Sequence, residues 1–206
     1  MDVKYDYEFY RRFKKFVNFY MKHVYNIECN GIENIPKDKN YILVGNHLNI
    51  LDSWLLIAVT DEHLRFMVDK KLYNTKPGEW FFKKVGTFEI DPNETDPRKK
   101  QIALKNAIEL LKSGEKVVIF PEGETHPIDV KIPFKGRVSA ISKLAKTKLV
   151  PFGINGTYKP FTKLQINIGE PIDFTKIKLP KNEETSYVEN IVRKLEPQAN
   201  EKRSLR

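Results

Sequence analysis

The sequence has a single cysteine, Cys29, so no disulfide can form within the chain. It has neither a C-x-x-C pair nor a Cys/His cluster of the kind that binds zinc. No apolar run approaches the roughly 20 residues that cross a bilayer, and the opening MDVKYDYEF lacks the apolar centre of a signal peptide. A G-x-S-x-G elbow is also missing, which disfavours a serine hydrolase. These absences predict a globular protein of a reducing compartment, without a metal centre.

The charge is unbalanced toward the positive side. The 206 residues carry a net charge of +9, with 40% hydrophobic and 31% charged residues. This composition is typical of one globular domain rather than of a disordered chain. Such a surplus of positive charge favours anionic partners, namely nucleic acid, an anionic membrane or phosphorylated substrates. The alternative is that the lysines only keep the protein soluble.

Residues 1–29 differ from the rest of the chain. Apolar residues spaced as on one face of a helix are Phe9, Phe13, Phe16, Val17, Tyr20 and Val24. Basic residues that fall largely off this face are Arg11, Arg12, Lys14, Lys15 and Lys22. A basic, aromatic-rich amphipathic helix is typical of a membrane-interface segment. The alternative is that the aromatic stripe packs onto the domain core, and one helix can do both.

From residue 30 onward, strand and helix patterns alternate. Apolar runs predict strands at 41–45, 64–68, 87–90, 116–120, 148–154 and 163–169. Helical patterns span 53–60, 76–86, 96–114, 137–146 and 184–197. This alternation predicts an α/β domain over 30–197, with a largely parallel sheet flanked by helices and a polar tail at 198–206. Pro151 would suit an edge strand or an irregular strand end.

Two candidate residues, His47 and Asp52, follow the strand at 41–45. Within one helix, residues five apart point in different directions, so the two side chains meet only if His47 lies in the turn before the helix. Asn49 is a suitable N-cap, which would place Asp52 at the third helical position, facing back to the turn. An imidazole that is oriented by a carboxylate is the general base of acyl-transfer chemistry. The alternative is a capping carboxylate beside a chance histidine.

A second loop, with Pro121, Glu122 and Gly123, follows the strand at 116–120. The carboxyl ends of parallel strands are where the sites of open α/β sheets form. Gly123 would let a ligand approach the backbone, and Glu122 would hold a hydroxyl or a cationic side chain. Taken alone, the segment also fits an ordinary turn with an exposed glutamate.

Together the two loops resemble the glycerolipid acyltransferase family, which includes bacterial 1-acylglycerol-3-phosphate acyltransferases. NHLNILD (46–52) is similar to the family's N-H-x4-D block, and FPEGET (120–125) to its F-P-E-G block. Further similar blocks, in order, are VGTFEID (85–91), the segment 132–156 with its K-G element, and INIGEP (166–171). The resemblance covers roughly residues 35–175.

The resemblance implies O-acyl transfer from acyl-CoA or an acyl carrier protein to a lysophospholipid such as 1-acyl-sn-glycerol-3-phosphate, giving phosphatidic acid. His47 would be the general base and Asp52 its orienting partner. Residues implied to bind substrate are Asn46, Phe120, Pro121, Glu122, Gly123 and Lys135. No metal or other cofactor and no nucleic acid is implied, and the expected location is the cytoplasmic face of the cell membrane, as a peripheral protein.

This chain departs from the family pattern at two arginines associated with glycerol phosphate. Pro92 and Thr125 stand in their places, and the acidic Glu124 precedes Thr125. Arginine suits phosphate because its planar fork binds two oxygens at once. Arg98, Lys135 or Arg137 would then supply the positive charge.

Three functions remain open from the sequence. The first is acylation of 1-acyl-sn-glycerol-3-phosphate, and the second is the same chemistry on another lysolipid or hydroxyl acceptor. The third is a basic module that binds a membrane or nucleic acid without catalysis, although no nucleic-acid-binding signature is present. His126 is a weaker alternative to His47 as the active imidazole, because only Asp129 and Glu124 are near it as carboxylate partners.

Overall fold

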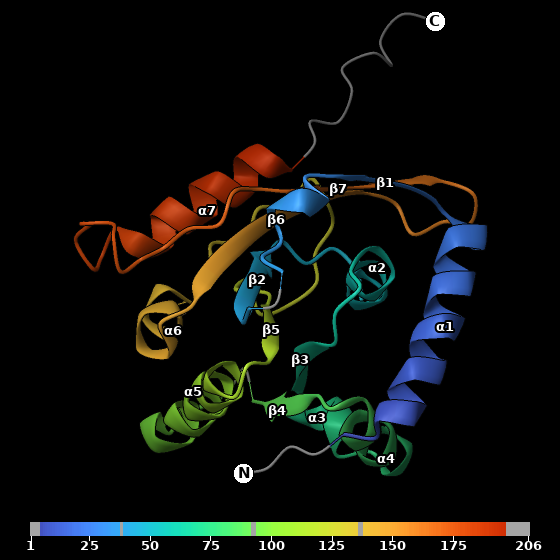
Figure 1. Cartoon of the computed structure of the whole chain (residues 1–206), viewed down its shortest axis with the longest axis horizontal. Coiled ribbons are helices and arrows are strands. Elements are labelled where there is room, and N and C mark those ends of the chain that lie inside the picture. Colours follow the sequence, from blue (N-terminus) through green and yellow to red (C-terminus); the bar gives the residue numbers. More distant parts are fainter. Residues whose placement is uncertain (1–4, 38, 92–93, 136–137, 197–206) are drawn as a thin grey trace, which may run out of the picture.

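A seven-stranded sheet runs through the computed structural model, which describes residues 5–37, 39–91, 94–135 and 138–196 (Figure 1). Its strand order is β1-β7-β6-β2-β5-β3-β4, and all neighbours are parallel except β6 and β7. The strands are β1 (Asn26–Asn30), β2 (Tyr41–Gly45), β3 (Leu64–Asp69), β4 (Phe88–Ile90), β5 (Lys116–Ile119), β6 (Lys148–Gly156) and β7 (Lys163–Ile168). The predicted α/β fold with a largely parallel sheet is confirmed.

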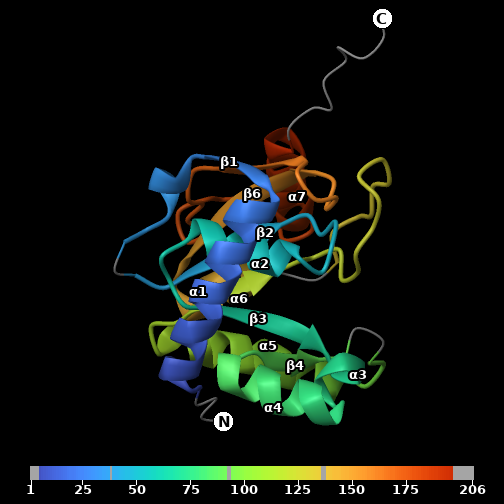
Figure 2. The same cartoon turned by 90° about the vertical axis from the view of Figure 1, so that its right-hand side faces the viewer.

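Helices cover both faces of the sheet (Figures 1 and 2). They are α1 (Tyr7–Val24), α2 (Asp52–Val59), α3 (Lys70–Tyr73), α4 (Lys76–Val85), α5 (Pro97–Lys112), α6 (Val138–Ala145) and α7 (Glu184–Leu195), with a short 3-10 turn at Ile32–Asn34. The five helices predicted after residue 30 are present with ends within two residues, and the helix predicted within residues 1–29 covers Tyr7–Val24. The side chain of Asp96 caps α5 by accepting from the Arg98 amide, as the sequence predicts.

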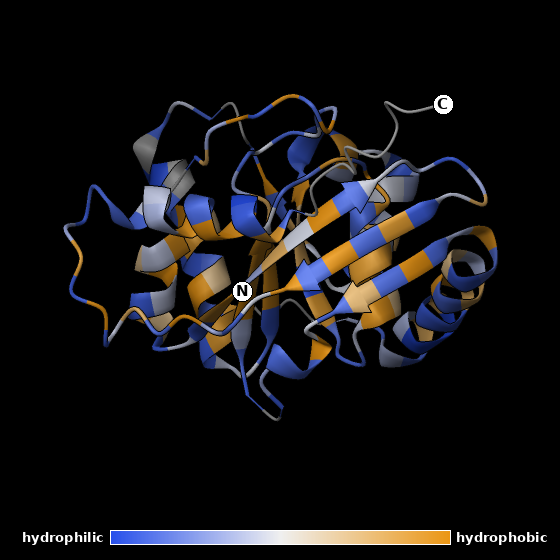
Figure 3. Cartoon of the chain, turned by 90° about the horizontal axis from the view of Figure 1, so that it is seen from above, coloured by the Kyte–Doolittle hydropathy of each residue, from blue (hydrophilic) through white to orange (hydrophobic). Residues whose placement is uncertain are grey.

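Strand β2 shows how the sheet separates two cores. Its side chains alternate, so Tyr41 and Leu43 pack with α1 and α2, whereas Ile42 and Val44 pack with α5, α6 and α7. All four residues are fully buried. Hydrophobic residues therefore gather between the sheet and the helices on both sides (Figure 3). This two-sided burial holds the carboxyl end of β2 rigidly in the centre of the molecule.

Helix α1 is joined to the domain rather than separate from it. Val17 and Met21 are fully buried in the core shared with α2, so the core-packing reading holds for one face of α1. Residues 26–30 form β1 at the sheet edge, which means that the predicted boundary at 29/30 cuts through a strand. The predicted tail at 198–206 lies outside the described residues. In the part of the chain that the structure describes, no helix has the length and apolar character to span a membrane.

Pro151 lies in β6, an interior strand, so the expectation of an edge position is wrong. It pairs with Val44 on the β2 side. On the other side, the ladder with β7 begins only at Phe152, and the Pro151 carbonyl accepts from the Gly169 amide at 2.8 Å. A residue without an N–H is tolerated there because the β6–β7 ladder is interrupted at this point.

Candidate active site

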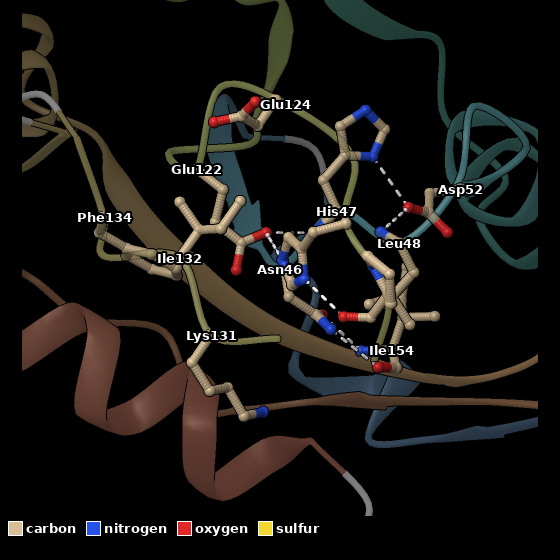
Figure 4. Close-up of polar contacts among 12 residues, drawn as sticks. Asn46, His47, Leu48, Asp52, Glu122, Glu124, Lys131, Ile132, Phe134 and Ile154 are labelled. Carbon is tan, nitrogen blue, oxygen red and sulfur yellow. Dashed lines mark hydrogen bonds and ion pairs between the residues drawn. The ribbon is translucent and has the colours of Figure 1, made fainter. Parts of the chain in front are cut away.

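A histidine and a carboxylate meet where β2 ends. The chain leaves the sheet after Gly45, and Asp52 is the first residue of α2. The His47 Nδ1 atom lies 2.8 Å from Asp52 Oδ2 (Figure 4). The Asp52 side chain is completely buried, whereas 19% of the His47 side chain is exposed. The predicted pairing of these two residues is confirmed, with the carboxylate inside the protein and the imidazole at the surface.

The turn between the strand and α2 folds around the Asp52 carboxylate. Asp52 Oδ2 accepts from the backbone amides of Leu48 at 2.6 Å and Asn49 at 2.9 Å. The expected N-cap at Asn49 is wrong, because Leu51 is the N-cap and the Asn49 side chain instead accepts from the Leu51 amide at 3.0 Å. Asp52 is thus the first helical residue rather than the third, and it still reaches back to the turn. The Asp52 carboxylate therefore closes the turn by accepting from two of its backbone amides.

The His47 ring is held from the other side by Phe120. The two rings stack with centroids 4.0 Å apart and an interplanar angle of 13°. When Nδ1–H donates to Asp52, Nε2 carries the lone pair, and no described residue hydrogen-bonds to it. The imidazole is therefore oriented by a carboxylate and an aromatic face, with one basic nitrogen free for a ligand.

Asn46 fixes the backbone just before the histidine. Its side-chain amide donates to the Ile154 carbonyl at 2.8 Å, and its Oδ1 accepts from the Ile154 amide at 2.7 Å (Figure 4). The residue is 1% exposed. These two bonds tie the end of β2 to β6, so this asparagine positions His47 through the backbone.

Glu122, from the loop after β5, completes the surroundings of His47. Its side chain is fully buried, and Oε2 accepts from the His47 amide at 2.6 Å. Oε1 is 3.0 Å from Nη1 of Arg193 on α7. The Nε2 atom of His126 lies 2.9 Å from Oε2, but outside the angles of a hydrogen bond. Glu122 thus joins both loops to α7 and holds a cationic side chain, one of the two roles expected from the sequence.

The next residues of this loop, Gly123 and Glu124, are exposed. Gly123 adopts a left-handed conformation with φ of 78°, and the atom nearest to a Cβ added there would be Lys135 Cδ, 4.0 Å away. The Pro121 carbonyl accepts from the Lys135 amide at 2.7 Å, which places the two segments side by side. The Lys135 ammonium lies 3.3 Å from Glu124 Oε1, and both side chains are exposed. The described residues contain no group of three or more His, Cys, Asp or Glu side chains placed to hold a metal.

Comparison with known proteins assigns the chain to a family. The model of the Acyltransferase family matches residues 26–155, which is more than half of the chain. The chain belongs to the acyltransferase family.

The relatives of this acyltransferase have a consistent description. A 1-acyl-sn-glycerol-3-phosphate acyltransferase of Streptococcus pneumoniae is 30% identical over 173 residues, which cover 80% of this chain and 62% of that protein. One of Bacillus subtilis is 30% identical over 146 residues, covering 68% of this chain and 70% of that protein. The crystal structure of the 1-acyl-sn-glycerophosphate acyltransferase PlsC from Thermotoga maritima matches with a TM-score of 0.73 at 26% identity, covering 91% of this chain and 76% of that one.

His126 has a structural place in the acyltransferase. It is 6% exposed, its Nδ1 is 2.8 Å from the Pro127 carbonyl oxygen, and its Nε2 faces Glu122. Its backbone amide donates to the His47 carbonyl at 3.1 Å. Both ring nitrogens therefore point at protein atoms, which leaves His47 as the imidazole with a free nitrogen.

Two residues of the acyltransferase site, Tyr158 and Arg193, were not found from the sequence. The Tyr158 hydroxyl donates to Asp52 Oδ1, and the Arg193 guanidinium pairs with Glu122. Burial and the Asp52 charge raise the pKa of Tyr158, so its hydroxyl stays a donor. A tyrosine shortly after the predicted strand at 148–154 was a usable signal, because parallel strands end at the same edge. Arg193 gave no such signal within its helical pattern.

Three residues were expected to replace the charge of the two family arginines, and the structure describes two of them, Arg98 and Lys135. Pro92 and Arg137 lie outside the described residues. Arg98 is exposed near the start of α5, and Lys135 is exposed beside Glu124. Lys135 thus offsets the negative charge of Glu124 next to the loop that holds Glu122.

Proposed function

We propose that this protein is an O-acyltransferase that moves a fatty acyl group from an acyl thioester to a hydroxyl of a lysophospholipid. The acceptor would be 1-acyl-sn-glycerol-3-phosphate and the product phosphatidic acid, which places the protein in phospholipid biosynthesis. The observation that carries this proposal is the His47 imidazole, which is bonded through Nδ1 to buried Asp52 and has no bond at Nε2 from the residues that the structure describes. The names of the relatives support the choice of acceptor.

The reaction uses His47 as general base and general acid in turn. Nε2 accepts the proton of the acceptor hydroxyl as its oxygen attacks the thioester carbonyl carbon. The carbon–sulfur bond of the tetrahedral intermediate then breaks, and the proton on Nε2 passes to the leaving thiolate. Asp52 stabilises the imidazolium between these steps and holds the ring in one orientation. The acyl group is transferred directly, so no serine or cysteine nucleophile is needed.

The donor in this proposal is acyl-CoA or an acyl carrier protein, and no metal or other cofactor takes part. Lys135 and Arg98 are candidates to bind the acceptor phosphate, since both are exposed. Asn46 and Glu122 support the site from within, because their polar atoms are bonded to Ile154, Arg193 and the His47 amide. Phe120, Pro121 and Gly123 would line the acceptor side.

A different acceptor is the second candidate. Glu124 stands next to the position where the family has an arginine, and a carboxylate there repels a phosphomonoester. The same chemistry on a lysolipid without a terminal phosphate, or on another hydroxyl compound, would tolerate Glu124.

The test of the reaction is release of free thiol from acyl-CoA by purified protein in detergent micelles, with acyl carrier protein as a second donor. 1-Acyl-sn-glycerol-3-phosphate and a panel of other lysolipids are compared, beside a His47→Ala variant. Turnover with 1-acyl-sn-glycerol-3-phosphate that the variant loses supports the first candidate. Turnover only with another acceptor supports the second. If no thiol is released with any acceptor and either donor, the proposed activity is contradicted.

Peripheral attachment to a membrane, on its cytoplasmic face, belongs to the same proposal. The outward side of α1 exposes 55% of Phe16 and 63% of Phe19, and α4 exposes 56% of Trp80 nearby. Basic residues flank these aromatics on α1, as on helices that lie in the interface of an anionic membrane. A surface of this kind would bring the site to its lipid substrates.

Point variants test this attachment better than removal of residues 1–27, which would also remove Val17 and Met21 from the core. We expect Phe16→Ser and Phe19→Ser to weaken sedimentation with anionic liposomes by about tenfold per ring, through lost apolar burial. Ile102→Ser on α5 is the matched control, since Ile102 is 58% exposed on the other side of the sheet. Equal binding by all three variants would exclude the α1 surface as the attachment site.

A further inference from the structure

Tyr158 touches the catalytic pair from a segment that the proposed mechanism does not use. It lies just after β6, in the connection to β7, and its hydroxyl donates to Asp52 Oδ1. Asp52 Oδ2 accepts from His47 Nδ1 and from the Leu48 and Asn49 amides. Among the described residues, Tyr158 is the sole hydrogen-bond donor to the other oxygen. It therefore fixes the plane of a carboxylate that is otherwise held by one oxygen alone.

The loop that carries Tyr158 is fastened to the end of α1. The Phe161 amide donates to the Val24 carbonyl at 2.6 Å, and the Asn26 amide donates to the Thr162 carbonyl at 3.1 Å. Phe161 adopts a left-handed backbone with φ of 64°, a conformation that costs energy in a residue other than glycine. A bulky residue keeps such a conformation only where its surroundings hold it. The loop thus has one defined shape, set by its bonds to residues 24 and 26.

The Tyr158 ring has a second support from Tyr25, directly after α1. The two rings meet edge to face, with centroids 5.8 Å apart and an interplanar angle of 75°. Tyr25 is 5% exposed, so this contact lies in the core rather than at the surface. An aromatic contact of this kind restrains ring orientation and directs the hydroxyl toward Asp52.

We propose that Tyr158 is a positioning residue of the acyltransferase, which holds Asp52 and thereby His47 through a loop anchored at the end of α1. The proposal rests on the proposed function, in which His47 is the base. The hydroxyl draws charge from the carboxylate as well as orienting it. Without it, more of the Asp52 charge faces the imidazole, and the imidazole holds its proton more tightly.

The test is Tyr158→Phe, with Tyr41→Phe as the matched control. Tyr41 is fully buried at the start of β2, and none of the described residues hydrogen-bonds to its hydroxyl, so its removal affects the core alone. For Tyr158→Phe we expect kcat to fall about tenfold, as for loss of one hydrogen bond to a charged group. The acidic limb of the pH profile of kcat/KM should move to higher pH, with KM little changed.

A purely structural role would give another result. If Tyr158→Phe and Tyr41→Phe share the same kcat and the same pH profile, the proposal is wrong. A lower melting temperature with an unmoved acidic limb would overturn it as well.

A spectroscopic readout separates this proposal from the proposed function. The NMR signal of the His47 Nδ1 proton, assigned by its loss in His47→Asn, should shift in Tyr158→Phe and stay in place in Tyr41→Phe. If the unaltered protein acylates no acceptor, the proposed function fails, and this signal alone decides about Tyr158. If the unaltered protein is active and the signal does not shift, only the positioning role fails.

Discussion

The carboxyl ends and the amino ends of the parallel strands, here called the carboxyl edge and the amino edge, each place a histidine beside a carboxylate. The two histidines differ in what their second ring nitrogen meets. At the carboxyl edge, His47 Nδ1 lies 2.8 Å from Asp52, and in the described part of the chain nothing hydrogen-bonds to Nε2. At the amino edge, just before β3, His63 Nδ1 lies 3.8 Å from Glu115, and Nε2 is 3.0 Å from the Val85 carbonyl oxygen. Burial lowers the pKa of His63 to about 4. A histidine near a carboxylate becomes a base only if one nitrogen is aligned with it and the other is open.

The same edges also differ in their arginine–glutamate pairs. At the amino edge, Arg65 Nη2 lies 2.8 Å from Glu115, and Nη1 donates to the Gly86 carbonyl at 2.9 Å. At the carboxyl edge, Arg193 lies 3.0 Å from Glu122, which in turn holds the His47 amide. One pair joins structural segments to each other, whereas the other reaches the backbone of His47, the proposed general base.

The largest expected difference is between the two histidines. His47→Asn should lower kcat by about 10²- to 10⁴-fold, because the general base is lost. His63→Asn should leave kcat per folded molecule unchanged and lower the free energy of unfolding instead. Steady-state kinetics and urea denaturation of both variants measure this. Near-normal turnover by His47→Asn would remove the assigned base.

Next are the two arginines. Arg193→Met and Arg65→Met should each lower the free energy of unfolding by about 3–5 kcal/mol, since each leaves a glutamate without its cation. Arg193→Met should also lower kcat, whereas Arg65→Met should not. Lys194→Met, an exposed neighbour on α7, is the control.

A second change identifies the cause of the Arg193 effect. Adding Glu122→Gln to Arg193→Met removes the unpaired charge and should recover part of the stability. If the double variant is no more stable than Arg193→Met, the burial of an unpaired Glu122 is not the reason for the loss.

The histidine at the amino edge should make stability depend on pH. The pKa of His63 is about 4 in the folded protein, against 6.5 for an unperturbed histidine. Between these values the unfolded chain binds more protons, so stability is fully present above pH 6.5 and falls as the pH drops toward 4, by about 3 kcal/mol. Urea denaturation over this range, compared with His63→Asn, measures the contribution. An identical pH dependence in the variant would refute it.

The smallest expected difference is between two glycines. Gly123 at the carboxyl edge and Gly114 at the amino edge both have positive φ, of 78° and 95°, and no atom of the described residues lies closer than 4.0 Å to where a Cβ would be. Alanine at either position should cost about 1 kcal/mol of stability from the left-handed backbone. Only Gly123→Ala should raise the KM for the acceptor, if the acceptor lies against that loop. Equal KM values for the two variants would show that the acceptor does not lie against the Gly123 loop.

The sequence predicted the parts of the site that are close along the chain. His47 and Asp52 are five residues apart, and a turn between a strand and a helix is enough to bring them together. The strand order and Arg193 could not be predicted in this way. Arg193 meets Glu122 across 71 residues, and its helical pattern alone does not reveal which buried charge it will face.

The fold shows the same limit at the N-terminus. The helical pattern identified α1, and its mixed aromatic and basic faces were consistent with both core packing and a membrane surface. The segment 26–30 alternates polar and apolar residues, but it is short and has only two apolar residues, Ile27 and Cys29, and its strand forms by pairing with β7. Such pairing is decided by a distant part of the chain, so local sequence carries little sign of it.

The pairing of β1 with β7 has a consequence for synthesis. Asn26 pairs with Lys163, so 163 − 26 = 137 residues separate the partners. At ribosomal speeds, on the order of ten seconds pass between the synthesis of β1 and the synthesis of its partner β7. During that interval the aromatic stripe of α1 has no finished core to pack against. The aromatic face of α1 is therefore accessible to chaperones and membranes during synthesis. The sheet can be completed only after β7 has been made.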